Sequence, residues 1–509
     1  MTPPPEPTPE ARRLVYGLLI TLAAGLTLGR LASAERVNEP SVHRRDDDKA
    51  TPRPAWPRAR PEPWPTFSSN DRSRWATVRA LVDEGTFVVG RRGPATAAEG
   101  RPVPLAQRDK GIIFEDGWGS VDKVLHPQRQ EFYSTKPPLL TVIAAGEYWL
   151  LKRLFGWSIV EDRWLVIPLI LVSLNVVPLG IYLWVLADLA ERLGRTDWSR
   201  YFVVAAGGFA TLVTPFLISF NNHTVATAAA AVTRQPTPRC VRWRPAAAPC
   251  GWRHGLAAGF AACNELPAAA LAGGLGVYLL YRFPGRTLMY FLPGPVLLTG
   301  LMLGLNYWQF GDYEPVYAKF GTEWYHYEGS HWLPPGQTKP GIDYAGRNGE
   351  SKADYAFHLL IGHHGWFSLT PIMLMAMPGM LIGLASGGGT PGFPGANGGR
   401  PPPARPEPLA RLVALLTLLV SAVVIAFYIA RTDNYGGWSN GPRWLMWLTP
   451  LWLLCLLPIL DVLAPSRAGR GFALLLLALS ILSMSYQFWN PWRHPWIYNW
   501  MESRGWINY

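Results

Sequence analysis

Residues 163–190 read RWLVIPLILVSLNVVPLGIYLWVLADLA, an apolar run whose charged residues are Arg163 and Asp188. A helix needs about 20 apolar residues to cross a bilayer, so this run predicts a membrane span. Comparable runs predict spans at 14–32, 201–220, 286–307, 367–386, 409–430, 443–464 and 471–488. Two shorter spans, meeting at a polar hairpin, are expected within 255–282, and 222–233 is a further short one. The pattern predicts an all-α polytopic membrane protein with about 11 transmembrane helices.

The composition agrees with lipid as the solvent. The 509 residues are 49% hydrophobic and 16% charged, whereas soluble domains carry about 25% charged residues. The net charge of +12 lies largely in Arg/Pro-rich loops without interleaved aromatics, which favours lipid headgroups over nucleic acid as the partner. The four cysteines have no zinc-like spacing and suggest no disulfide framework; they are Cys240, Cys250, Cys263 and Cys455.

The orientation depends on segment 137–155, whose apolar face is interrupted by Glu147, Lys152 and Arg153. It either spans the bilayer or lies on its surface as an amphipathic helix. Only the surface placement brings the arginine-rich stretches to one side, as the positive-inside rule requires. These stretches are 12–13, 191–200, 234–253, 282–286, 387–408 and 467–470. The polar loops then all fall on the extracytoplasmic side, in what the high Ala/Arg/Pro composition suggests is a bacterial plasma membrane.

The chain divides accordingly along its length. A disordered cytoplasmic terminus (1–13) precedes a transmembrane core (14–307), which includes the outer loop 33–136 and the surface helix 137–155. An aromatic outer loop (308–366) leads to the C-terminal helices (367–488), which contain a Gly/Pro-rich linker at 387–408, and an outer tail follows at 489–509. Residues 233–253 read like a local reading-frame error, and the Leu-Ala-Ser-Ala that ends the first span would also suit a signal cleavage site.

Loop 33–136 contains the first candidate residues. From Asp71 onward, apolar residues recur at helical spacing, which predicts a short amphipathic helix on the membrane with Ser68 or Ser69 as its N-cap. Asp71 is then either a capping carboxylate or a site residue. Lys136, where the loop returns to the bilayer, is either a snorkelling lysine or a ligand.

The order of these residues resembles a known family. Asp71-Arg72-Ser73-Arg74-Trp75-Ala76, then Glu84-Gly85-Thr86-Phe87-Val88-Val89, then Lys136-Pro137-Pro138-Leu139 is similar to the first outer loop of the GT-C glycosyltransferases. The closest branches are the protein O-mannosyltransferase-like enzymes and the lipid A aminoarabinose transferases. The likeness covers roughly 68–310 in helix pattern and only weakly the C-terminal third.

The resemblance implies a polyprenyl-phosphate-linked sugar donor, an acceptor whose class stays unknown, and a first-loop carboxylate, matched by Asp71, as general base. Lys136 and Arg74 would bind the donor phosphate. The family's acidic pair is absent, because Asn70 and Arg72 flank Asp71. A second acid is also missing where the family often has it, since residues 221–224 read NNHT. Glu265 either replaces that acid or bonds backbone freed by Pro267. Asp116 and Asp122 are weaker substitutes for it and fit solvated loop residues better.

Further candidates follow from the outer segments. Asn222 and His223 are expected to bind substrate. Trp324 and Tyr325 belong to an aromatic loop that suits either sugar stacking or an interfacial belt. The turn 431–444 adds Tyr435, for substrate, and Arg443, whose guanidinium can grip a phosphate in bidentate fashion. The spacing of three histidines does not predict zinc, so no metal and no cofactor is expected; they are His358, His363 and His364.

Three functions compete on the sequence. The first is an inverting glycosyltransferase that acts at the extracytoplasmic face. The second is a transporter or flippase of lipid-linked saccharides, which should show internal hydropathy repeats and ionisable residues near mid-bilayer, and neither is evident. The third is a non-catalytic membrane scaffold with a folded outer loop.

Overall fold

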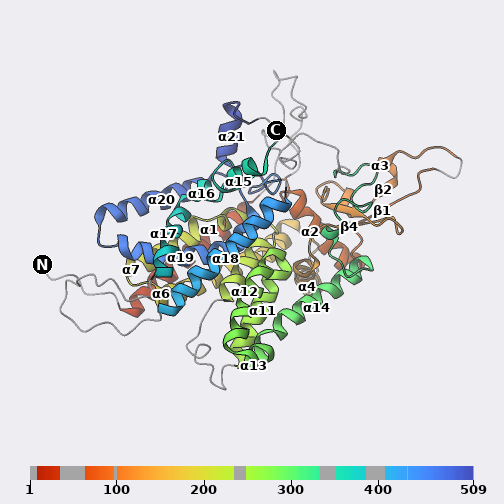
Figure 1. Cartoon of the computed structure of the whole chain (residues 1–509). Coiled ribbons are helices and arrows are strands. Elements are labelled where there is room, and N and C mark those ends of the chain that lie inside the picture. Colours follow the sequence, from red (N-terminus) through yellow and green to blue (C-terminus); the bar gives the residue numbers. More distant parts are fainter. Residues whose placement is uncertain are drawn as a thin grey trace, which may run out of the picture.

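The structure is a computed structural model and describes residues 8–34, 63–96, 100–233, 248–332, 350–385, 407–432 and 434–507. Within these ranges the chain is mostly helical (Figure 1). Six segments are long and apolar enough to cross a membrane, judged by length and composition: Pro9–Ser33, Arg163–Leu193, Pro284–Phe310, Leu409–Arg431, Arg443–Leu463 and Arg467–Ser485. The prediction of a helical membrane-type chain is thus confirmed in this coarser form, and the larger number of spans stays a prediction.

These six segments consist of the following elements. The first is α1 (Pro9–Ser33), and the second joins α5 (Arg163–Leu171) to α6 (Val177–Leu193) through the π-helical turn η4 (Val172–Val176). The third comprises α13 (Pro284–Arg286), η7 (Thr287–Phe291) and α14 (Pro293–Phe310). The others are α18 (Glu407–Arg431), η11 (Arg443–Leu448) with α19 (Thr449–Leu463), and α20 (Arg467–Ser485).

Two predicted spans are broken into shorter pieces. Segment 201–220 forms α7 (Asp197–Phe209) and α8 (Val213–Phe216), whose Pro215 has no amide hydrogen to continue a helix. Segment 367–386 forms α16 (Trp366–Leu369), a 3-10 helix from Pro371 to Met375, and α17 (Ala376–Ala385). The next helices along the chain after α8 are α9 (His223–Val232), α11 (Ala248–Asn264) and α12 (Ala269–Arg282).

The first outer loop contains a small β-sheet, so the all-α prediction is wrong there. Its strands are β1 (Gly90–Arg92), β2 (Asp109–Lys110), β3 (Lys123–Leu125) and β4 (Glu131–Ser134), antiparallel in the order β2-β1-β4-β3. Strands this short show no recognisable alternation in the sequence. Gly111 (φ +111°) follows β2, and a side chain there would meet the Cα of Gly90 at 2.6 Å. Glycine is therefore needed for the chain to turn against β1.

The sheet packs against the aromatic loop that begins at residue 308. Phe87, Val124 and Tyr133 share a hydrophobic cluster with Phe310, at the end of α14, and with Tyr325. The amide of Leu125 in β3 also donates to the carbonyl of Trp324 at 3.0 Å. In Figure 1 the sheet lies at one edge of the helical body, beside α2 (Ser69–Arg79) and α4 (Pro138–Phe155). The two loops therefore form one compact unit.

Segment 137–155 forms the single amphipathic helix α4. Leu139, Leu140 and Tyr148 are buried, whereas Trp149 and Leu154 are exposed. It packs against α2 and α14. Because it contains three charged residues, α4 is not one of the six segments that could cross a membrane. Its placement on the membrane surface stays a prediction.

Polar contacts gather at the two ends of the bundle. At one end, Arg12 Nε lies 2.9 Å from Glu191, and the Tyr16 hydroxyl donates to the same carboxylate at 2.6 Å. Asp461 lies at this end too, where it binds residues 195–199. At the other end the first outer loop meets the aromatic loop, with Arg108 2.8 Å from Glu328. Two of the arginine-rich stretches, 12–13 and 191–200, thus lie together, and the side on which they lie stays a prediction.

Candidate active site

Helix α2 presents the first candidate residues to the interior. It begins after Ser68, whose hydroxyl accepts the amide of Asp71 at 3.3 Å, as a helix N-cap does. Asn70, Asp71 and Arg74 are all buried because the helix is enclosed by α4 and the sheet. The helix predicted from Asp71 onward is thus present, and its placement on the membrane stays a prediction.

Asp71 is held by the protein on both of its oxygens. Oδ2 accepts the amide of Phe67 at 2.8 Å, and Oδ1 accepts the amide of Phe220 at 2.9 Å and the indole of Trp75 at 3.0 Å. The side chain is 1% exposed. Burial raises the pKa of Asp71 to about 6, although the two backbone amides and the nearby arginines oppose the shift. These contacts tie α2 to the segment before α9.

A chain of hydrogen bonds connects α2 to the C-terminal half of the molecule. Arg74 donates to the amide oxygens of Asn70 and Asn222, and Asn222 donates in turn to Glu265. Asn222 also donates to the carbonyl of Asn264 at 2.6 Å, at the end of α11. The hairpin residue Glu265, 6% exposed, is thus held among side chains from two other elements.

His223 connects these hydrogen-bonded residues to Arg443. Its Nδ1 contacts Glu265, and its Nε2 lies 3.0 Å from Nη1 of Arg443. Since a guanidinium can only donate, Nε2 accepts and Nδ1 carries the hydrogen toward the carboxylate. Arg443 also donates through Nε to the carbonyl of Gly436 at 3.1 Å. A neutral histidine therefore links a carboxylate to a cation.

Lys136 completes the group through an ion pair that the sequence did not predict. Its Nζ lies 2.6 Å from Oδ1 of Asp122, and both side chains are largely buried, with 14% and 13% exposed. The pairing of β3 with β4 brings the two side chains together. Lys123 lies opposite Ser134, and Asp122 and Lys136 lie just beyond these paired residues. Asp122 is therefore not the solvated loop residue that the sequence suggested.

These residues share one electrostatic environment, and we call them the outer cluster: Arg74, Asp122, Lys136, Asn222, His223, Glu265 and Arg443. Burial lowers the pKa of Lys136 to about 8, against the pull of Asp122. Burial would raise the pKa of Asp122, but Lys136, Arg443 and Arg74 together hold it below its ordinary value. Burial lowers the pKa of Arg74 to about 10, and the charge of Arg443 adds to the shift. Three cations therefore act on one another within a small volume.

The aromatic candidates lie elsewhere. Tyr325 is 3% exposed and packs edge-on against Phe320 and Trp332, while Trp324 packs against His126 and Phe310. Their rings form the core of the outer unit, so we do not keep them as sugar-stacking residues. Tyr435 is fully buried, stacks on Tyr355 and donates its hydroxyl to Glu350 at 2.8 Å. It thus belongs to a second polar group.

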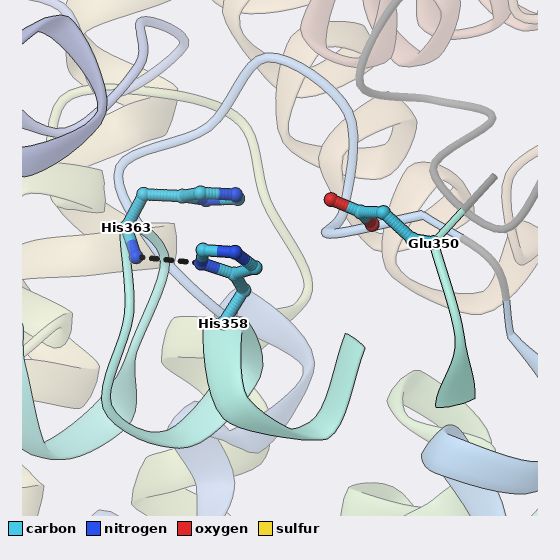
Figure 2. Close-up of side chains that lie close together, drawn as sticks. All are labelled: Glu350, His358 and His363. Carbon is cyan, nitrogen blue, oxygen red and sulfur yellow. Dashed lines mark hydrogen bonds between the residues drawn. The ribbon is translucent and has the colours of Figure 1, made fainter. Parts of the chain in front are cut away.

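This second group corrects our interpretation of the histidines. His358 and His363 do have a carboxylate beside them, since Glu350 lies close to both (Figure 2). Glu350 lies eight residues before His358, so no ligand spacing within one helix could indicate it.

Comparison with known proteins adds one finding. No protein-family model matches this sequence, and no curated protein matches it. Among solved structures, the fold is similar to the apo crystal structure of the Archaeoglobus fulgidus oligosaccharyltransferase, with a TM-score of 0.45 and 9% sequence identity. The alignment covers 96% of this chain and 57% of that one, so the chain spans little more than half of its length. We therefore argue the function from this chain's own residues.

Proposed function

We propose that this chain is an inverting glycosyltransferase that moves a sugar from a polyprenyl-phosphate donor to an acceptor hydroxyl at the extracytoplasmic face of a membrane. The observation that carries the proposal is the outer cluster, in which Lys136 pairs with Asp122 and the charges of Arg74 and Arg443 also act on that carboxylate. Buried cations are costly, and such groups commonly mark a place where an anion binds. The donor's phosphate is such an anion.

The chemistry favours cations at this position. The acceptor oxygen attacks the anomeric carbon, and the bond between that carbon and the phosphate oxygen breaks. The phosphate changes from a diester with one negative charge to a monoester that gains a second. Cations beside the leaving oxygen are therefore worth more in the transition state than in the bound donor. Lys136 and Arg443 are the half-buried members that a lipid phosphate would meet first, with Arg74 behind them.

We assign the role of general base to Asp122. Its partners are the side chains of Lys136 and Thr135, at 2.6 and 3.5 Å. When the donor phosphate takes the ammonium group, the carboxylate loses its main partner and can accept the proton of the acceptor hydroxyl. Asp71, which the family resemblance suggests for this role, has both oxygens occupied by protein donors, and we assign it the role of an anchor.

Glu265 then acts as a positioning residue. It contacts Asn222 and His223, which hold Arg74 and Arg443 respectively. One carboxylate thus orients both guanidinium groups without needing to touch the donor.

The test is cleavage of the donor. The full chain, purified and reconstituted in liposomes, is supplied with undecaprenyl phosphates that carry different radiolabelled sugars, and with bacterial membranes as the acceptor source. We expect release of undecaprenyl phosphate and transfer of label for at least one sugar, both lost in Lys136→Ala. A flippase would instead expose intact donor to the opposite leaflet, and that result with no cleavage would refute the proposal.

A further inference from the structure

A second polar group lies around the segment that begins at Glu350. One ligand atom from each of Glu350, His358 and His363 lies within 4.8 Å of the other two. Glu350 and His358 are half-buried and His363 is buried. Figure 2 shows the carboxylate turned toward the two imidazole rings, which lie one above the other. The set is thus enclosed by the protein but still reachable from outside.

The local sequence builds this arrangement. Ser351 caps α15 (Lys352–Leu360) in a reciprocal capping box with Asp354, which fixes Glu350 just before the helix and His358 in its last turns. The chain then turns at Gly362, where a side chain would lie 2.3 Å from Nδ1 of His358. That glycine lets His363 fold back until its ring stacks on His358, with 4.0 Å between ring centroids.

Contacts with neighbouring side chains orient the potential ligands. The hydroxyl of Tyr435 donates to Oε2 of Glu350 at 2.8 Å. Nδ1 of His363 lies 2.6 Å from Nδ1 of His364, which occupies that side of the ring. Ligating carboxylates and histidines in metal sites are held by such hydrogen bonds.

We propose that Glu350, His358 and His363 bind a divalent transition metal, for which zinc is the best match. Two imidazoles with one carboxylate is a donor set that zinc uses when its fourth position holds water, whereas magnesium and calcium prefer oxygen alone. Zinc bonds of about 2.0–2.2 Å would require these ligand atoms to close by roughly 1 Å. Rotation of the half-buried Glu350 and His358 side chains can supply that movement.

A metal here would also fix part of the outer cluster. Tyr435, which holds Glu350, is followed by Gly436, whose carbonyl accepts from Arg443. Metal binding would therefore stabilise the turn that positions Arg443. This consequence rests on the proposed function, whereas the metal site itself does not.

The experiment uses the full chain in detergent, stripped with a chelator and titrated with zinc against a chromophoric competitor. We expect one zinc per chain, with affinity at least 100-fold weaker in His358→Ala and in His363→Ala. Tyr435→Phe, which removes only the hydroxyl beside Glu350, should weaken binding about 10–100-fold. His331→Ala changes a histidine outside the group and should bind as the wild type does.

Melting curves show whether each variant is folded, and cobalt gives a second readout. A folded wild-type chain should give the visible absorption of cobalt in a nitrogen and oxygen site, and His358→Ala should lose it. Absence of zinc and cobalt binding in the folded wild type, or equal binding in all variants, would overturn the metal site. Neither result affects the proposed transfer reaction, which is measured separately as donor cleavage.

Discussion

Asp461 and Asp122 lie at opposite ends of the helical body and are held by different kinds of partner. Asp461 accepts the backbone amides of Arg195 and Thr196, both at 2.8 Å, together with the hydroxyls of Thr196 and Ser199. Asp122 has the side chain of Lys136 as its main partner. A carboxylate that binds backbone amides fixes the fold, because no ligand can replace those donors without moving the chain. One that binds a side chain can exchange its partner for a substrate.

The same distinction separates the acids within the outer half. Asp71 accepts two backbone amides and in this respect resembles Asp461. Glu265 contacts Asn222 and His223 through their side chains and resembles Asp122. From these partners we infer that Asp122 is the general base and Glu265 a positioning residue, and that Asp71 and Asp461 stabilise the fold.

The largest effect should come from Lys136→Ala. Removing a charge that stabilises the leaving phosphate should lower donor cleavage about 100- to 1,000-fold, as the loss of a transition-state donor does in other enzymes. Arg12→Ala, at the opposite end, removes an ion pair with Glu191 and should leave cleavage per folded molecule unchanged. If both variants lost donor cleavage equally, the reaction could not be assigned to the end that contains Lys136.

Arg443→Lys should have a smaller effect on the same reaction. Lysine keeps the charge but loses the fork that reaches Gly436 and His223 together. Losing one charged hydrogen bond costs about 1.5–3 kcal/mol, which corresponds to roughly 10–100-fold in cleavage. Initial rates at low donor concentration measure it, and Arg200→Lys at the opposite end is the matched control. A wild-type rate in Arg443→Lys would remove Arg443 from the phosphate site.

The pH dependence should follow Lys136. Its pKa is lowered to about 8 by burial, and the amine must be protonated to hold a phosphate, so kcat/KM for the donor should fall as the pH rises through about 8. Lys136→Arg should keep its charge and move this alkaline limb to higher pH. A limb that does not move in this variant would show that another group controls it.

Asp71→Asn should act on stability rather than on chemistry. An asparagine cannot accept all three hydrogen bonds, and each buried donor left unsatisfied costs about 1–3 kcal/mol. We expect a lower melting temperature and a nearly normal cleavage rate per folded molecule. Asp116→Asn, at an exposed position of the same loop, should change neither quantity appreciably.

The sequence indicated the apolar segments well because a bilayer span needs a long uninterrupted run. The runs at 163–190 and 409–430 both became long helices. Segment 201–220 did not, since hydropathy takes no account of Pro215, which cannot donate a helical hydrogen bond. The sheet was missed because β2 has two residues, too few for any alternation.

The site was predicted only in part. Lys136, Arg74, Asn222, His223, Glu265 and Arg443 were all candidates, and the structure brings them together. Asp122 was only a weak candidate in the sequence, because the pairing of β3 with β4 is what places it beside Lys136. Glu350 was missed for a similar reason, since a turn between His358 and His363 makes it their neighbour. Residues joined by tertiary pairing have no fixed spacing in a sequence.

The most direct test compares Asp122→Asn with Asp71→Asn in the donor-cleavage assay, with each rate divided by the folded fraction. We predict that Asp122→Asn loses cleavage per folded molecule by about 100- to 10,000-fold, the usual range for a general base. Asp71→Asn should melt earlier and still cleave the donor. Wild-type cleavage by Asp122→Asn, together with a stable but inactive Asp71→Asn, would contradict the account and return the role of base to Asp71.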